Sequence, residues 1–400
     1  MKTKLSIVAA AVLGVASINA NAATAYRVKD LGALPGSGSF SLAYSISNNG
    51  LVSGQSRGSM PVNGADDVTG STSAVRFHTN GYVQDLGSLG GTPGGHGVTA
   101  YGRAINNNGK VAGYSTISTP DGSRVYNAFV NDYALGHMKN IGTLGNGRDS
   151  RAYGINNNGM VVGWSDTTAD GSKQSAFVYD SNTGEMKALE GPMLGGNRSF
   201  AFDINDNGQI AGTATTGDGS GHAFIYENGI AKDLGSLDDT GISEARAINE
   251  KGYVTGWSLT DTNDYHAFLY DGTEMIDLGS LGGDTKGWDV NIHGQVVGSG
   301  TDADGNNISF LYSDGEMMNL IDLLSPEEQA TVKEFREAVS INDDGTIVGR
   351  ASFLTEDGNS ITRAFQLSAV PVPGAIFLMG PAVAFLGFMG KRRAQAAQVA

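Results

Sequence analysis

Oxygen-bearing side chains recur at alternate positions in one polar segment of the chain. Asp302, Asp304 and Asn306 have the oxygen ligands and the spacing of a calcium-binding loop. The residue order of an EF-hand and its closing glutamate are missing, so the segment also fits an ordinary Asp-Gly turn. The sequence leaves calcium open at these three residues and predicts no other cofactor.

Four charged residues interrupt a repeated pattern of small and bulky side chains. Asp203 and Asp289 stand where the other repeats have serine, alanine or glycine. If the repeats close around an axis, the two carboxylates point into a central channel, where they either hold a cation or bond neighbouring backbone. Arg103 and Arg246 occupy the position one residue earlier, where they could bind an anion or form ion pairs between repeats.

Aromatic rings and histidines supply the other candidate residues. Trp288 shares the position of the two arginines, and His96 lies in a glycine-rich insertion, so both are candidates for ligand binding. The repeated positions of His222 and His266 favour a structural role. A further set follows a repeated glycine, where sugar stacking competes with packing between repeats; it comprises Tyr114, Trp164 and Trp257.

Several catalytic signatures that short motifs can reveal are missing from the sequence. It contains no H-E-x-x-H pair, no phosphate-binding loop and no S-x-D-x-G-x-T-W box. No catalytic residue is therefore predicted, and we expect a non-enzymatic binding module. The alternative is a carbohydrate-active enzyme, a glycosidase or lyase, that uses acidic residues on a loop face.

One phrase, represented by residues 155–163, is repeated along the chain with few substitutions. An asparagine opens a four-residue turn and a glycine closes it, as in Asn156 to Gly159, which is typical of a type I turn. Apolar and β-branched residues on both sides predict a hairpin of two strands. The seven copies are Ile46 to Gly54, Ile105 to Gly113, Ile155 to Gly163, Ile204 to Gly212, Ile248 to Gly256, Val290 to Gly298 and Ile341 to Gly349.

Each repeat holds two more strand signals, one around Ala-Phe and one ending in Asp-Leu-Gly. Four strands in about 49 residues match the blade of a β-propeller. Residues 26–32 supply a fourth strand without its first three, and residues 362–367 supply a third strand without its fourth. The sequence therefore predicts an all-β fold: a seven-bladed β-propeller of four-stranded antiparallel blades over residues 23–369, closed by the N-terminal strand.

The strand before each hairpin is predicted to be the innermost strand of its blade. Small residues stand one and three positions before the Ile or Val, and a bulkier residue stands between them, so alternation places the two sets on opposite strand faces. Three long insertions fall on the opposite end from the hairpin turns, at 57–73, 88–99 and 321–337. The last predicts a helix with Ser325 as N-cap, Pro326 at its first position and Glu328 closing a capping box. This loop face is the expected binding surface.

The two ends of the chain read as targeting segments. Residues 1–22 combine Lys2 and Lys4 with an apolar run and a small-x-small cleavage site, which predicts a signal peptide. Residues 370–400 hold a proline-rich box, an uncharged stretch at 374–390 and the basic cluster 391–393, which predict a transmembrane helix. This layout resembles a PEP-CTERM sorting segment, although Val372 stands where that motif has glutamate. The resemblance implies an exosortase-type processing enzyme, and a plain inner-membrane anchor is the alternative.

His222-Ala223-Phe224 and His266-Ala267-Phe268, with the Asp-Leu-Gly-x-Leu and Ile-Asn-x-x-Gly-x-Val-x-Gly phrases, resemble the HAF family of probable extracellular repeat proteins. The resemblance covers nearly all of residues 26–367 and implies bacterial export, with no assigned reaction. A net charge of −15 makes nucleic acid a poor partner, and the absence of cysteine excludes disulfides and thiolate chemistry. We therefore expect an exported protein of the cell surface, envelope or matrix that binds polysaccharide or a surface protein, with a link to exopolysaccharide.

Overall fold

The computed structural model describes residues 25–36, 40–57, 71–90, 98–119, 122–131, 137–191, 193–238 and 241–370. Residues 26–369 form one compact unit. The expected signal peptide and residues 371–400 of the expected sorting segment lie outside the described ranges, as does His96. Within those ranges, no helix has the length and apolar character needed to cross a membrane.

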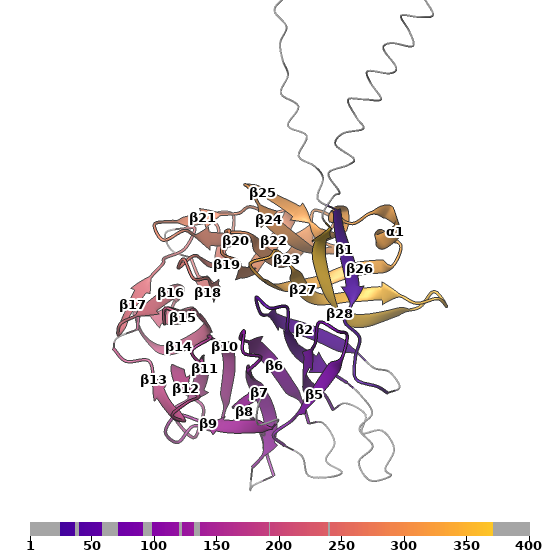
Figure 1. Cartoon of the computed structure of the whole chain (residues 1–400). Helices are drawn as coiled ribbons and strands as arrows, with labels where there is room; N and C mark the ends of the chain where they lie inside the picture. Colours follow the sequence, from indigo (N-terminus) through magenta and orange to yellow (C-terminus); the bar gives the residue numbers. More distant parts are fainter. Residues whose placement is uncertain are drawn as a thin grey trace, which may run out of the picture. The chain divides into compact units, whose positions relative to one another are not determined.

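The described part of the chain forms seven four-stranded antiparallel sheets, so the predicted seven-bladed β-propeller is confirmed (Figure 1). Blades 1 to 6 each use consecutive strands, in the order in which the chain makes them. Blade 1 contains β2 (Ser41–Ile46), β3 (Val52–Ser56), β4 (Ser73–Phe77) and β5 (Val83–Gly87); blade 2 contains β6 (Ala100–Ile105), β7 (Val111–Ser118), β8 (Arg124–Asn131) and β9 (Met138–Gly142); blade 3 contains β10 (Ser150–Ile155), β11 (Met160–Asp166), β12 (Gln174–Asp180) and β13 (Glu185–Ala188). Blade 4 contains β14 (Gly195–Ile204), β15 (Ile210–Thr216), β16 (Gly221–Glu227) and β17 (Ile230–Asp233); blade 5 contains β18 (Ser243–Ile248), β19 (Val254–Leu259), β20 (Tyr265–Tyr270) and β21 (Met275–Asp277); blade 6 contains β22 (Gly282–Val290), β23 (Val296–Asp302), β24 (Asn307–Ser313) and β25 (Glu316–Asn319).

Blade 7 is assembled from both ends of the compact unit. It consists of β26 (Val332–Ile341), β27 (Ile347–Leu354), β28 (Ser360–Val370) and, as its outermost strand, β1 (Ala25–Asp30). Just beyond β1, Leu31 N donates a hydrogen bond of 2.9 Å to Ala364 O. Val28 packs against the apolar cluster that contains Phe365. The predicted closure by the N-terminal strand is therefore confirmed.

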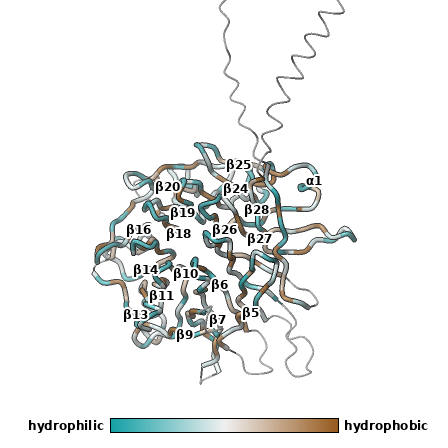
Figure 2. The backbone as a smooth tube through the Cα atoms, viewed as in Figure 1, coloured by the Kyte–Doolittle hydropathy of each residue, from teal (hydrophilic) through white to brown (hydrophobic). Residues whose placement is uncertain are grey.

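In blades 2 to 7 a glycine and a phenylalanine face each other on neighbouring strands, whereas in blade 1 Val75 lies opposite Gly54. Gly163 of β11 pairs with Phe177 of β12, and the phenylalanine is fully buried. A Cβ on Gly163 would lie 1.9 Å from the carbonyl oxygen of Arg151, so no larger residue fits there. This contact explains why the repeated hairpin ends in glycine and why Ala-Phe follows it. Hydrophobic positions accordingly recur in every blade and do not gather in one layer (Figure 2).

The first strands of the blades, β2, β6, β10, β14, β18, β22 and β26, are innermost, as predicted (Figure 1). The expected alternation along them is wrong, because each contains a β-bulge at the bulky residue; in β10 the pairing moves from Ala152 to Gly154 and leaves Tyr153 without an opposite partner. Close packing accompanies the bulge: a Cβ on Gly154 would lie 2.9 Å from the Cα of Asp203 in the next blade. Small and bulky residues therefore both reach the channel.

The insertion at 321–337 differs in part from its prediction. A 3₁₀ turn, η1 (Leu320–Leu323), precedes α1 (Pro326–Gln329), a single turn with Ser325 as N-cap. The Ser325 hydroxyl accepts a bond from Glu328 N, as expected of the cap. The Glu328 carboxylate does not close a capping box, however. It accepts a 3.0 Å hydrogen bond from Val28 N and so ties the insertion to the closing strand β1.

Candidate functional site

A cavity of about 460 Å³ lies where the seven innermost strands meet. Five residues that the sequence singled out line it together: Arg103, Asp203, Arg246, Trp288 and Asp289. Its wall extends to the hairpin turns, where Asn249, Glu250, Asn291 and Asp343 contribute. This is the end opposite to the loop face that the sequence favoured. The loop face stays a prediction, because two of its three insertions fall mainly outside the described residues.

The bulge residues form a nearly continuous belt of aromatic rings and guanidinium groups around the channel. The Arg103 Cζ lies 4.4 Å from the ring centroid of Tyr44 and 5.3 Å from that of Tyr153, in the two flanking blades. The Tyr153 and Phe202 rings then meet edge to face at 5.4 Å. The Arg246 Cζ lies 4.3 Å from the Phe202 ring and 5.1 Å from the Trp288 ring. Val339, the seventh member, has no ring. Such cation–π contacts stabilise both guanidinium groups in the channel wall.

The two arginines of this belt differ in their polar partners. Arg246 forms an ion pair with Glu244 on its own strand, and its Nε is buried without a partner. The predicted ion pair between blades is therefore wrong for Arg246. Arg103 has no hydrogen-bond or ion-pair partner among the described residues, and none of its nitrogens is among the buried unsatisfied atoms. Its N–H groups therefore remain accessible from the cavity.

The two channel aspartates join neighbouring blades. Asp203 accepts hydrogen bonds from Ile204 N (2.8 Å) and from Ile248 N in the next blade (2.9 Å). Asp289 accepts from Ile341 N (2.9 Å) and from the Ser340 hydroxyl (2.6 Å). Of the two expectations for these carboxylates, backbone bonding is the one that the geometry displays.

Burial controls the ionisation of these groups. It raises the pKa of Asp203 to about 7, against the lowering effect of the Ile248 N–H. Burial also raises the pKa of Asp289, which is opposed first by the hydrogen bond from Ser340. Burial raises the pKa of Tyr44 to about 12, so this ring stays neutral. Asp203 is thus partly protonated near neutral pH.

A ring of buried asparagines surrounds the channel at the hairpin turns. The side chain of Asn156 accepts from Met160 N of its own turn and donates to Asn205 O of the next blade, at 2.9 and 3.0 Å. The same donation runs from Asn106 to Asn156, from Asn205 to Asn249, from Asn249 to Asn291, from Asn291 to Asn342 and, at 3.5 Å, from Asn342 to Ser47. Sequence analysis found the first role of this asparagine and missed the second.

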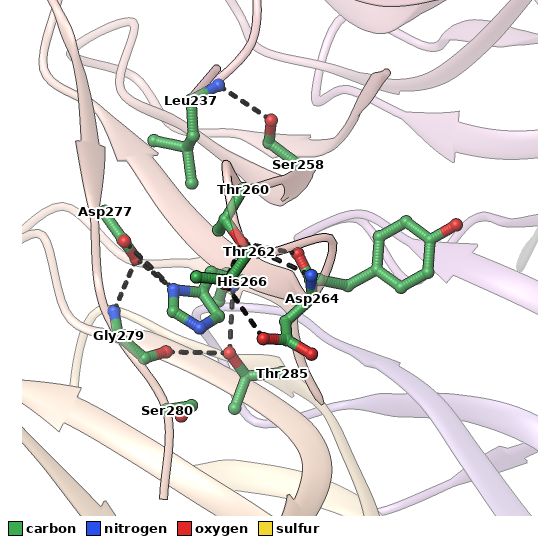
Figure 3. Close-up of polar contacts among 12 residues, drawn as sticks. Leu237, Ser258, Thr260, Thr262, Asp264, His266, Asp277, Gly279, Ser280 and Thr285 are labelled. Atoms are coloured by element: carbon green, nitrogen blue, oxygen red, sulfur yellow. Dashed lines mark hydrogen bonds and ion pairs between the residues drawn. The ribbon is translucent and has the colours of Figure 1, made fainter. Parts of the chain in front are cut away.

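The remaining repeated polar residues also hold the blades together. Thr285, from blade 6, accepts from Ala267 N at 3.0 Å and donates to Gly279 O at 2.8 Å in blade 5 (Figure 3). Equivalent hydroxyls accept from the alanine of Ala-Phe at Ser41, Ser150, Ser199 and Ser243. A serine or threonine recurs five positions before the hairpin Ile or Val in most repeats, and this was the overlooked signal.

The two histidines of the His-Ala-Phe triplets make matching contacts. His266 Nδ1 lies 2.9 Å from Asp277 Oδ1 (Figure 3). In the preceding blade, His222 Nδ1 lies 3.0 Å from Asp233 Oδ2. These aspartates begin the Asp-Leu-Gly phrase, so each pair joins the third and fourth strands of one blade. The structural interpretation of the histidines agrees with this geometry.

The aromatics that follow the hairpin glycine pack largely between blades. The Trp164 ring meets Phe200 of the next blade edge to face at 5.7 Å. The ammonium group of Lys286 in blade 6 lies 4.8 Å from the Trp257 ring in blade 5. Tyr114 likewise contacts Tyr153 of the next blade at 5.8 Å. Packing between repeats therefore accounts for the positions of Trp164 and Trp257, whereas Tyr114 also lines the central cavity.

Asp302, Asp304 and Asn306 form a turn at the end of β23. The Asp302 carboxylate accepts from Asp304 N (3.0 Å), from Asn306 N (2.8 Å) and from the Asn306 amide. These hydrogen bonds lower the pKa of Asp302. In the part of the chain that the structure describes, no group of three or more His, Asp or Glu residues is arranged to hold a metal. Calcium binding at this turn stays a prediction.

Comparison with known proteins finds a match to one family model of unknown function and distant similarity to several solved structures. A profile described as a protein of unknown function (DUF3466) matches residues 95–282. No curated protein matches the chain. The solved structures include TolB from Acinetobacter baumannii, with 14% identity over 64% of this chain and 63% of that one and a TM-score of 0.38, and a prolyl endopeptidase, with 12% identity over 88% and 51% and a TM-score of 0.49. The chain thus spans less than two thirds of the length of TolB and about half of the endopeptidase. Neither likeness bears on activity, and the HAF and PEP-CTERM resemblances stay predictions.

Proposed function

We propose that this protein is a non-enzymatic binding module whose ligand enters the central cavity from the hairpin-turn end. The observation that carries the proposal is the contrast between the cavity and the rest of the scaffold. The repeated polar residues are used in hydrogen bonds between and within blades, whereas the Arg103 guanidinium in the cavity wall has no hydrogen-bond or ion-pair partner in the part of the chain that the structure describes. A cavity of about 460 Å³ has the size of a site for a small ligand or one end of a polymer.

A saccharide is the ligand class that we favour. Arginine donors, carboxylate acceptors and aromatic rings are together in one wall, and hydroxyl groups can both donate and accept. The HAF and PEP-CTERM resemblances imply export and a link to exopolysaccharide at the cell surface. On this proposal the C-terminal segment anchors or sorts the chain at the inner membrane, and the propeller binds polysaccharide or a surface protein outside it.

A second candidate is a carbohydrate-active enzyme, and one observation favours it. Glycosidases pair a carboxyl group of raised pKa with a second carboxylate. Burial raises the pKa of both Asp203 and Asp289, and both line the cavity. Against this role, the oxygens of both groups already accept hydrogen bonds from the next blade. The two carboxylates therefore act first as hydrogen-bond acceptors that join neighbouring blades.

A glycan and polysaccharide screen on the full chain tests both candidates. The screen is run with and without calcium, and released product is followed in the same wells. We expect binding of at least one saccharide and no turnover. Turnover that disappears in Asp203→Asn would establish the enzyme in place of the binding module. Binding that requires calcium and is lost in Asp302→Ala would instead move the site to the Asp302 turn.

A further inference from the structure

We infer that Arg103 forms an oxyanion subsite in the channel, and that the group it takes is the carboxylate of an acidic saccharide such as a uronate. This inference rests on the proposed function, because it names the ligand class of the same cavity. It starts from a comparison of two arginines that occupy equivalent bulges. Glu244 neutralises the charge of Arg246, whereas no acidic residue in the described part of the chain forms an ion pair with Arg103.

Arg246 is an example of a channel arginine whose packing and charge are both satisfied by neighbouring side chains. Its guanidinium lies between the rings of Phe202 and Trp288, and its charge is balanced by Glu244. Glu244 is itself fixed by a 3.2 Å hydrogen bond from Trp257 Nε1. The charge of Arg246 is thus balanced within its own strand, although its buried Nε has no hydrogen-bond partner among the described residues.

Arg103 has the same aromatic flanks without the acid. The rings of Tyr44 and Tyr153 cover it from the neighbouring blades, and the Tyr44 hydroxyl is occupied by Gln55 at 2.8 Å. Against the lowering effect of burial, Tyr114 is the group that raises the pKa of Arg103 most. Glu337, the carboxylate that contributes after the tyrosines, is paired with Arg350 at 3.1 Å. A guanidinium carries five N–H donors, and leaving them unmatched away from bulk water costs free energy. The donors therefore need acceptors from the cavity.

The geometry selects a carboxylate as that acceptor. A guanidinium binds carboxylates through two parallel N–H···O bonds, and aromatic contacts on its flanks hold it in place for such a pair. The carboxyl groups of Asp203 and Asp289 belong to blades 4 and 6, which do not adjoin blade 2. They can accept hydrogen bonds from hydroxyl groups at the other end of the same ligand. A uronate carries both kinds of group.

Titration calorimetry of the full chain with D-glucuronate, its methyl ester and D-glucose tests the inference. We expect glucuronate to bind at least tenfold more tightly than the other two sugars. Arg103→Met should weaken glucuronate binding by about 10- to 100-fold while leaving the affinity for glucose unchanged, because a hydrogen-bonded charge pair contributes about 1.5–3 kcal/mol. Arg103→Lys should give an intermediate affinity, since it keeps the charge and loses the paired geometry. A galacturonate oligomer in the same titrations distinguishes a free sugar from a polymer end.

Arg151→Met is the matched control. Arg151 also lies against aromatic rings, those of Tyr126 and Trp164, but it is paired with Asp149 outside the cavity. We expect this variant to bind glucuronate like the wild type, and thermal unfolding of each variant establishes that it is folded.

The outcomes separate the inference from the proposed function. Equal binding of glucuronate and its methyl ester, or an unchanged glucuronate affinity in Arg103→Met, would overturn the oxyanion subsite while a saccharide site still stood. If no sugar binds, the proposed function fails, and titration with acetate then decides the subsite alone. Acetate binding that depends on Arg103 would support it, and no such binding would end it.

Discussion

The residues that recur in most blades and those that vary at one repeated position have different surroundings. The repeated asparagine of the hairpin turn donates a hydrogen bond to the next blade, and the serine or threonine within the inner strand accepts one from the preceding blade. The bulge position varies instead, with Tyr44, Arg103, Tyr153, Phe202, Arg246, Trp288 and Val339 around the channel. Repetition marks the residues that assemble the ring, and variation marks the wall of its cavity.

The same blade geometry places the recurring residues at the edges between blades and the varied residues at the channel. Seven blades can close only if each offers the same edge to its neighbour, which constrains the residues at that edge. The bulge points each varied side chain away from the ladder and toward the channel, where no such constraint applies. A ligand that lacks sevenfold symmetry can therefore be recognised by a scaffold that nearly has it.

Among the changes considered, loss of the closing strand β1 should lower the unfolding free energy of the ring of blades most. A chain that begins at residue 35 lacks β1 together with the buried Leu31 and Leu34. We expect a loss of roughly 5 kcal/mol or more, comparable with the whole stability of a small domain. The measurement is thermal and urea unfolding, with a chain that begins at residue 25 as the control. Equal midpoints for the two chains would contradict closure as the source of stability.

Replacement of Asp203 by asparagine should change how stability depends on pH. Burial raises the pKa of Asp203 from its ordinary value of 3.8 to about 7, so the folded protein holds this proton more tightly than the unfolded chain. The wild type should therefore lose stability as pH rises from about 4 to about 7, and should change little above that for this group. Between pH 5 and pH 8 we expect its loss to exceed that of Asp203→Asn by about 3 kcal/mol.

Urea unfolding of both proteins at pH 5 and pH 8 provides the measurement. Asp289→Asn should shift the dependence in the same direction, because burial also raises the pKa of Asp289. Parallel curves for the wild type and Asp203→Asn would mean that this carboxyl is not buried as the structure has it.

The parts of this structure that sequence could predict are those that local spacing determines. Asn156 and Gly159 define a turn, and the strand at 26–32 without a blade of its own points to closure. The bulges could not be predicted, because alternation assumes a regular pleat. The pleat is broken where Gly154 packs against the backbone of Asp203 in the next blade. The aromatic contacts of the two channel arginines were missed for the same reason, since they depend on which side chains the bulges bring together.

Removal of one amide from the asparagine ring should have a smaller effect than either change above. Asn156→Ala leaves Asn205 O without its side-chain donor and Met160 N without its side-chain acceptor in a buried turn. We expect a loss of about 2 kcal/mol in unfolding free energy. Asn158→Ala is the matched control, because Asn158 is exposed although it donates to Asp206 O of the same neighbouring blade. A similar cost for both variants would remove the distinction between the buried ring and the exposed rim.

Substitution at the varied bulge position should have the smallest effect on stability. Arg103→Met keeps an unbranched side chain between Tyr44 and Tyr153 and breaks no hydrogen bond or ion pair to a described residue. We expect a change within about 1 kcal/mol, mainly from the lost cation–π contacts. Arg246→Met removes the cation that neutralises Glu244 and should cost more, because a partly buried carboxylate is then left unpaired. Urea unfolding of the two variants at one pH compares them directly. Arg103→Met could instead lower the unfolding free energy as much as Arg246→Met does. Arg103 would then be one of the residues that stabilise the ring of blades, and its position in the cavity would not indicate ligand binding.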